Sequence, residues 1–177
     1  MKTSDFQPWL FCVEPFEGES ISHFLGRFRR ANEMTPNGLA KAAGLEGAIA
    51  RWEKFRFNPP PSRQQLEALA VLVGLEADRL VQMLPPVGVG MKMEPIRLCG
   101  ACYAQSPCHK IEWQFKSTQG CVGDSRGVSH RHQLSLLSEC PNCGARFKIP
   151  ALWVDGWCHR CFLPFEEMTK HQKLIQV

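Results

Sequence analysis

The sequence predicts an α+β protein in which a helical domain containing a helix-turn-helix precedes two tandem zinc-ribbon-like fingers. Apolar residues recur with helical spacing through the first half, and Cys-x-x-Cys pairs repeat through the second. A stretch rich in proline and glycine, P-P-V-G-V-G at 85–90, separates the two. We therefore expect a helical domain with an irregular N-terminal segment over 1–90, a first zinc-binding module over 91–138, and a second zinc ribbon with a C-terminal tail over 139–177.

The composition is that of a globular protein, with 44% hydrophobic and 21% charged residues. No apolar run reaches the roughly 18 residues that a membrane span needs. The N-terminus lacks the apolar region of a signal peptide. Nine cysteines on such a chain favour metal thiolates in a reducing cytosol over a disulfide framework, so we expect a cytoplasmic bacterial protein.

The formal net charge of +4 lies entirely in the second half, because residues 1–90 carry ten basic and ten acidic side chains. The sequence predicts eight zinc ligands, all in the second half, and seven of them are cysteines. As thiolates they would add seven negative charges, of which two Zn²⁺ ions would balance only four. The zinc-loaded protein would then carry a charge of about +1. Global charge is therefore weak support for a nucleic-acid partner.

Capping residues mark three helix starts. Ser20 precedes an apolar face with i, i+3, i+4, i+7 spacing, formed by Ile21, Phe24, Leu25 and Phe28. Thr35 precedes a proline at the first helical position, and Ser62 forms a capping box with Gln65. A short strand is expected over 9–13.

Two stretches in this half share a small residue, a glycine four residues later and an apolar residue beyond it. They are Ala40, Gly44 and Ala50, and then Ala70, Gly74 and Leu80. A glycine turn between closely crossing helices is typical of a helix-turn-helix. Two plain helical hairpins of a small bundle fit the pattern equally well.

The segment R-W-E-K-F-R-F at 51–57 interleaves basic and aromatic residues, which suits contacts to a nucleic-acid backbone together with stacking on bases. The alternative is a helix that packs its aromatic residues inward and leaves its basic residues in solvent. The sequence leaves both open.

The second zinc site is predicted from two knuckles, C-P-N-C and C-H-R-C, separated by fourteen residues. This spacing is close to that of zinc ribbons. The predicted ligands are Cys140, Cys143, Cys158 and Cys161.

The first site begins with the knuckle C-G-A-C, which supplies Cys99 and Cys102. Cys121 follows an expected strand over 111–116, and we choose it together with His132, with His130 as the rival ligand. Cys108 and His109 follow the knuckle too closely to close around the same ion and are expected to form a short loop. Cys12 is expected to be a small core residue.

Two closed four-ligand sites leave no open position for catalytic water, and no H-E-x-x-H or H-x-E motif supplies a base. No phosphate-binding G-x-x-x-x-G-K-[ST] loop is present either. We therefore expect two structural Zn²⁺ ions and a protein that is not an enzyme.

Six segments together resemble one family along nearly the whole chain. They are P-W-L-F at 8–11, E-G-E-S-I-S-H-F-L-G-R-F-R-R-A-N at 17–32, P-I-R-L-C-G-A-C at 95–102, I-E-W-Q at 111–114, H-Q-L-S-L-L-S-E-C-P-N-C-G at 132–144 and W-C-H-R-C at 157–161. The chain resembles the TniQ proteins of transposition systems, and its shortness is most like the compact TniQ of type V-K CRISPR-associated transposons. It departs from the family where the third and fourth ligands of the first site are usually C-x-x-H, because here ten residues separate Cys121 from His132. The residues that follow His132 fit the family better than those that follow His130.

The resemblance implies a non-catalytic adaptor in RNA-guided DNA transposition. Such a protein links the CRISPR effector, with its guide-RNA scaffold, to the AAA+ ATPase TnsC and so selects the integration site, while target DNA is touched only indirectly or nonspecifically. The candidate contacts to these partners are Trp9, Phe11, Arg29, Arg30, Arg51, Trp52, Lys54 and Arg56. Trp153 and Trp157 are secondary candidates, for which packing within the ribbon is the simpler role. The alternative is a stand-alone zinc-containing helix-turn-helix regulator that binds a specific duplex.

Overall fold

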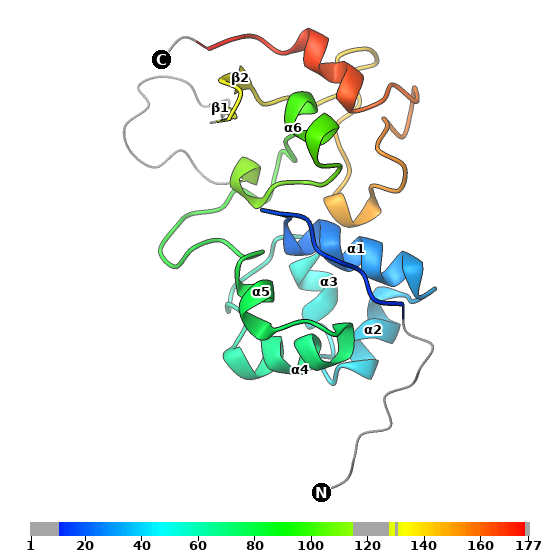
Figure 1. The fold of residues 1–177 in the computed structure, drawn as a ribbon, viewed down its shortest axis with the longest axis vertical. Coiled ribbons are helices and arrows are strands. Elements are labelled where there is room, and N and C mark those ends of the chain that lie inside the picture. The colour runs from blue at the N-terminus through cyan, green and yellow to red at the C-terminus, as the bar shows by residue number, and fades with distance from the viewer. Residues whose placement is uncertain (1–10, 115–127, 130, 176–177) are drawn as a thin grey trace, which may run out of the picture.

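The computed structural model describes residues 11–114, 128–129 and 131–175. These residues fold into a helical half (residues 11–84) and a cysteine-rich half (residues 91–175), stacked one on the other in Figure 1. The elements of the helical half are α1 Ile21–Ala31, α2 Pro36–Ala42, α3 Ala48–Trp52, α4 Arg63–Val73 and α5 Ala77–Val81. Those of the cysteine-rich half are α6 Gly100–Gln105, η1 Ile111–Gln114, β1 Val128–Ser129, β2 Leu134–Ser135, η2 Pro150–Leu152 and η3 Glu166–His171.

The predicted helix starts are confirmed. The Ser20 side chain accepts from the His23 amide at the N-terminus of α1, and the Thr35 side chain accepts from the Gly38 amide at that of α2. At α4, Ser62 and Gln65 form both halves of a capping box. These side chains satisfy backbone donors that have no partner within the helix, so each helix begins where its cap stands.

The core of the helical half forms around the apolar face of α1. Its four expected residues are at most 1% exposed. The pairs α2–α3 and α4–α5 pack against this face as two hairpins that turn at Gly44 (φ 65°) and Gly74 (φ 73°), in the left-handed region that glycine adopts without strain. The structure thus contains two helical hairpins, and a helix-turn-helix that reads DNA stays a prediction.

The cysteine-rich half consists mostly of loops and short turns of helix. Within the described residues, β1 and β2 form a two-stranded antiparallel sheet in which Val128 pairs with Ser135 and Ser129 with Leu134. Its core joins residues of both zinc-binding modules, including Leu98, Trp113, Phe147, Trp153 and Phe165. The modules predicted over 91–138 and 139–177 therefore share one hydrophobic cluster.

The strand expected over 111–116 is wrong where it is described, because residues 111–114 form the 3₁₀ helix η1. Trp113 and Gln114 are both buried, whereas a half-buried strand alternates buried and exposed residues. The Gln114 side chain accepts from the Arg97 amide and donates to the Lys92 carbonyl, and these bonds hold it inside. The strand expected over 9–13 is also absent from its described residues 11–13.

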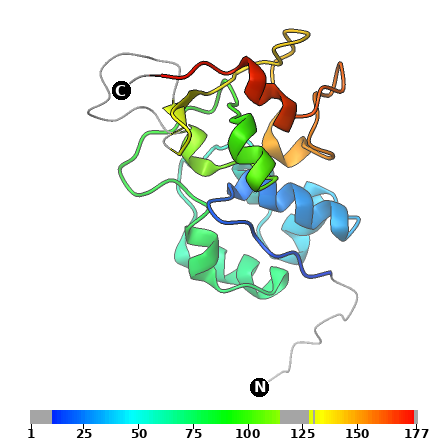
Figure 2. The same cartoon turned by 45° about the horizontal axis from the view of Figure 1, so that its top comes forward.

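The two halves meet where α1 lies against η2, and both views place these two elements side by side (Figures 1 and 2). Gly26 lies directly on Ala151, since an added Cβ would stand 2.3 Å from the Ala151 carbonyl oxygen. Ser22 Oγ accepts from the Ala151 amide at 3.2 Å and donates to the Glu53 carbonyl. Arg30 donates to the carbonyls of Ala151 and Trp153. Hydrogen bonds as well as packing therefore join the halves.

Candidate metal centres and an exposed N-terminal strap

The four cysteines of the second predicted site come together. The ligand atoms of Cys140, Cys143, Cys158 and Cys161 all lie within 4.8 Å of one another. The Cys140 and Cys161 sulfurs are 3.5 Å apart, and those of Cys143 and Cys158 are 3.6 Å apart. Zinc–sulfur bonds of about 2.3 Å in a tetrahedron require sulfur–sulfur distances of about 3.8 Å. The arrangement thus fits a tetrahedral metal ion after a small expansion.

Two tight turns present these sulfurs. In the first, the Cys140 amide donates to the Ala145 carbonyl and Gly144 has a φ of 67°. In the second, the Cys158 amide donates to the Leu163 carbonyl, and the corresponding residue is Phe162, with a φ of 60°. A side chain in this region is disfavoured by about 1–2 kcal/mol. The turn around the metal ligands thus holds Phe162 in a conformation that its sequence does not favour.

Local interactions shift the pKa values of two thiols of the second cluster in opposite directions. A hydrogen bond from the Asn142 side chain lowers the pKa of Cys161 to about 6, while burial raises the pKa of Cys140 to about 12. A thiolate is the form that binds metal. The hydrogen bond from Asn142 therefore favours the metal-binding form of Cys161.

Three ligands of the first predicted site also come together. His132 Nδ1 lies 3.1 Å from the sulfur of Cys102 and 4.0 Å from that of Cys99. A tetrahedral zinc ion bound by sulfur and imidazole nitrogen needs about 3.5 Å between such atoms, so these distances bracket the required value. Cys121 and the rival His130 lie outside the described residues, so the fourth ligand stays a prediction.

Local hydrogen bonds position the histidine and the knuckle. The amides of His132 and Gln133 both donate to the Ser129 carbonyl, which turns the chain between β1 and β2. Ser129 Oγ also lies 3.3 Å from the Cys102 sulfur. A hydrogen bond from the Cys102 thiol lowers the pKa of Cys99 to about 5 and raises that of Cys102 itself. This hydrogen bond therefore favours the thiolate form of Cys99.

Cys108 and His109 do not join the metal centres. Both are buried, and His109 Nδ1 lies 2.9 Å from Ser20 Oγ, which caps α1. Burial raises the pKa of the Cys108 thiol and lowers the pKa of His109. The short loop expected at Cys108 and His109 therefore contacts the helical half through Ser20. Cys12, in contrast, is exposed, and its prediction as a core residue is wrong.

A buried polar network beside this loop was missed from the sequence. Glu19 is fully buried, and it contacts His23 Nδ1 and accepts from Arg27 Nη1 at 3.0 Å. Burial lowers the pKa of His23. The i, i+4 spacing of Glu19 and His23 was the available signal. It was not used because Glu19 precedes the predicted helix, and no spacing rule predicts the contact between Glu19 and Arg27.

The candidate partner contacts divide sharply by exposure. Trp9 lies outside the described residues, whereas Phe11 is 68% exposed. One of the two residues proposed on α1 is corrected by its burial, and Arg30 stays a prediction. Arg29 is 8% exposed and pairs with Glu53 at 2.5 Å, so it faces the core, and Arg30 is partly buried against the η2 carbonyls.

The 51–57 segment follows the inward-packing alternative. Trp52 and Phe55 are 1% and 2% exposed, so neither ring has a free face for a base, and the candidate contact Trp52 is wrong. Arg51 donates to the carbonyls of Asn58 and Pro59. Lys54 and Arg56 are exposed and remain candidate contacts. On the second ribbon Trp153 is buried, whereas Trp157 is 46% exposed.

Residues 11–16, the N-terminal strap, cross the helical half with Phe11 presented to solvent. Asn32 accepts from the Phe11 amide at 2.6 Å and donates to the Phe11 carbonyl at 3.0 Å. Arg27 donates to the Glu14 carbonyl, and its guanidinium lies 4.2 Å from the centroid of the Phe16 ring. The backbone that carries Phe11 is therefore fixed although its ring is free.

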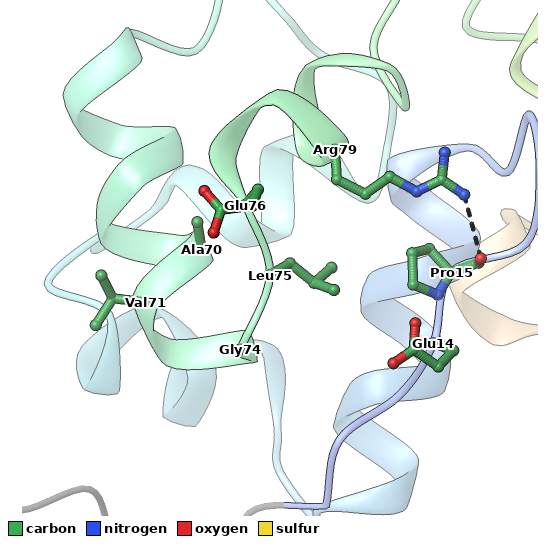
Figure 3. Close-up of a pocket in the computed structure, with 8 residues that line it drawn as sticks. All are labelled: Glu14, Pro15, Ala70, Val71, Gly74, Leu75, Glu76 and Arg79. Carbon is green, nitrogen blue, oxygen red and sulfur yellow. Dashed lines mark hydrogen bonds between the residues drawn. The ribbon is translucent and has the colours of Figure 1, made fainter.

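An open groove of about 590 Å³ separates the strap from the α4–α5 turn (Figure 3). Its lining is apolar at Val71 and Leu75 and carries the carboxylates of Glu14 and Glu76. Arg79, the basic residue of the lining, donates to the carbonyls of Pro15 and Phe16 and to Gln82. The carboxylates outnumber this engaged cation, so the groove disfavours a phosphate backbone.

The TniQ family model matches residues 10–136, which is more than two thirds of the chain and covers α1, both hairpins and the first metal centre. No curated protein matches the chain. Within the described ranges, no helix has the length and hydrophobicity that crossing a membrane requires.

Proposed function

The chain belongs to the TniQ family and is therefore a transposition-associated protein, and we propose that it acts as a non-catalytic adaptor in RNA-guided DNA transposition. In this role it links a type V-K CRISPR effector, bound to its guide-RNA scaffold, to the AAA+ ATPase TnsC and so selects the integration site. Family membership supports this reading, because TniQ proteins are generally non-catalytic accessory proteins of transposition.

The observation that carries the proposal is the way in which the N-terminal strap presents Phe11. The ring is 68% exposed, while two hydrogen bonds to Asn32 hold its backbone. An aromatic side chain that is already ordered loses little conformational entropy when a partner covers it. Aromatic residues, phenylalanine included, are enriched in protein–protein interfaces. We assign Phe11, together with Trp9, to the contact with TnsC.

Two structural zinc ions complete the proposal. Cys140, Cys143, Cys158 and Cys161 would hold one ion, and Cys99, Cys102, His132 and Cys121 the other. Both donor sets are those of structural zinc. Bound zinc supplies cross-links between distant segments. The residues around the centres orient these ligands through the turn at Gly144 and through Ser129.

The test is recovery of TnsC on immobilised protein carrying Phe11→Ala. Loss of a hot-spot ring weakens binding by about 2 kcal/mol, roughly 30-fold. Phe162→Ala is the matched control, because Phe162 is also 68% exposed but lies on the second ribbon. Asn32→Ala frees the strap without removing the ring, and we expect an intermediate loss. Unchanged TnsC recovery by Phe11→Ala would reject docking through the strap.

The rival function, a stand-alone regulator, predicts tight binding to a specific duplex with a steep salt dependence. The carboxylates of the groove beside the α4–α5 turn disfavour duplex binding at that surface. The adaptor predicts weak, nonspecific duplex binding. A salt-titrated binding assay on duplexes from the transposon ends and the target region separates the two, and a specific nanomolar site would favour the regulator.

A further inference from the structure

The C-terminal residues cross from the second ribbon to the first metal centre. After the hairpin that carries Cys158 and Cys161, the chain enters η3, which packs on α6 in both views (Figures 1 and 2). It then runs along β2. The Ser135 amide donates to the Lys173 carbonyl at 2.8 Å, and the Ile175 amide donates to the Gln133 carbonyl at 2.8 Å.

One side chain in this segment bridges the two parts of the first centre. Gln172 Oε1 accepts from the Gly100 amide at 2.8 Å, inside the Cys99–Cys102 knuckle. Gln172 Nε2 donates to the Ser135 carbonyl at 2.6 Å, three residues after His132. A single amide thus connects the cysteine ligands to the strand that follows the histidine ligand.

The knuckle is also packed tightly beneath η3. A Cβ at Gly100 would stand 2.6 Å from Thr169 Oγ1 and 2.7 Å from the Phe165 carbonyl oxygen. Real Cβ atoms do not approach backbone this closely. The first knuckle therefore fits under the C-terminal segment only because its second residue is glycine.

We infer that residues 165–175, the C-terminal clamp, position the first metal centre, with Gln172 as the positioning residue, so that metal retention there depends on a segment delivered by the second ribbon. This inference rests on the proposal that both centres bind zinc. Outer-shell hydrogen bonds that orient ligands typically change metal affinity by about 10- to 100-fold. Because the clamp contacts the first centre, the loss should be confined to that centre.

The test compares Gln172→Met with Lys170→Met in the full zinc-loaded chain. Methionine has the length of glutamine but cannot make either hydrogen bond. Lys170 lies on the same clamp, is exposed and forms an ion pair with Glu167. The zinc stoichiometry is measured first, and zinc release to a chromophoric chelator is then followed while iodoacetamide labels the freed thiols. Mass spectrometry of the peptides assigns release to Cys102 or to Cys158.

We expect Gln172→Met to release zinc from the first centre about 10-fold faster and to leave the second unchanged, with Lys170→Met like wild type. Equal release rates from wild type and Gln172→Met would overturn the clamp, and so would equal acceleration at both centres. A wild-type protein that holds fewer than two zinc ions would reject the zinc proposal itself, and the clamp with it. Gln172→Glu keeps an oxygen for the Gly100 amide and serves if the methionine variant does not fold; acceleration confined to the first centre is again expected.

Discussion

At the scale of single residues, Arg29 shows how a buried partner decides a role. Its guanidinium Nε lies 2.5 Å from Glu53 Oε1, and the two side chains are 10% and 5% exposed. Arg29 also donates to the Met34 carbonyl. The pair connects α1 to the end of α3 inside the helical half, where an unpaired charge is costly.

We predict that Arg29→Met lowers the free energy of unfolding by about 3–5 kcal/mol, because it leaves the Glu53 carboxylate buried without its partner. Arg63→Met is the control. Arg63 also forms ion pairs, with Glu67 and Asp78, but its side chain is 58% exposed. Its loss should cost much less than that of Arg29, because solvent screens an exposed ion pair. Urea unfolding of both variants measures the difference, and similar costs would contradict the burial argument.

Residue roles were predictable where neighbours in sequence decide them. Ser20, Thr35 and Ser62 cap helices because each side chain needs only an amide three residues ahead. The role of Arg29 depends on Glu53, 24 residues away, and a helical periodicity contains no information about that contact. The clustering of Cys99 and Cys102 with His132 was predictable because metal ligands reveal their partners by residue type.

At the scale of elements, the contact between α1 and η2 depends on a residue without a side chain. Gly26 lies in the middle of α1, where glycine is intrinsically unfavourable by about 1 kcal/mol relative to alanine. The close approach of Ala151 accounts for its presence, because a Cβ there would also stand 2.6 Å from the Ala151 Cα atom.

We predict that Gly26→Ala destabilises the protein by about 1–3 kcal/mol in urea unfolding, because the gain in helix propensity is smaller than the cost of separating α1 from η2. Gly38→Ala in α2 is the control. Its nearest neighbour would be Thr35 Oγ1 at 3.3 Å, and we expect stability within about 1 kcal/mol of wild type. If Gly26→Ala has the same free energy of unfolding as wild type, α1 and η2 can move apart without destabilising the protein.

Among the elements, the helices of the first half were predicted, whereas the strand predicted over 111–116 was wrong. Helical spacing and caps are local signals, and they were strong in the first half of the chain. In the cysteine-rich half, hydrogen bonds between distant segments set the backbone. The Gln114 side chain bonds near Lys92 and Arg97, and the Ile111 amide donates to the Gly18 carbonyl. None of these contacts leaves a periodic pattern in the sequence.

For the whole molecule, the two-part organisation could be predicted, but the joint between the parts could not. Composition marks the Pro/Gly-rich stretch at 85–90 and the change from helical spacing to cysteine knuckles. The joint consists instead of buried polar groups from both halves. His109 lies against Ser20 and near the rings of Phe55, Trp113 and Trp153, and His23 stands beside Trp153.

This joint should make folding stability depend on pH. Burial lowers the pKa of His109 and of His23 below the ordinary value of 6.5. The charged groups around them are Glu19, which contacts His23, together with Arg27 and Arg30. Both histidines are then neutral in the folded state at a pH where the unfolded chain is already protonated. Their contribution to stability is fully present above pH 6.5 and is lost as the pH falls toward the folded pKa values.

We predict that His109→Asn reduces this dependence. In the wild type, each buried histidine lowers the free energy of unfolding by up to about 1.4 kcal/mol per pH unit below pH 6.5. Asparagine keeps a polar atom near the position of Nδ1 for Ser20 but cannot titrate. The free energy of unfolding of the variant should therefore fall less steeply below pH 6.5, by the contribution of one histidine. His171→Asn, at an exposed site, should leave the slope unchanged. Wild type and the two variants keep the same metal ligands, so acid release of metal affects all three equally. The free energy of unfolding is measured in urea at pH values between 5.5 and 7.5. An equal pH dependence in wild type and His109→Asn would show that His109 does not couple the contact between the halves to pH.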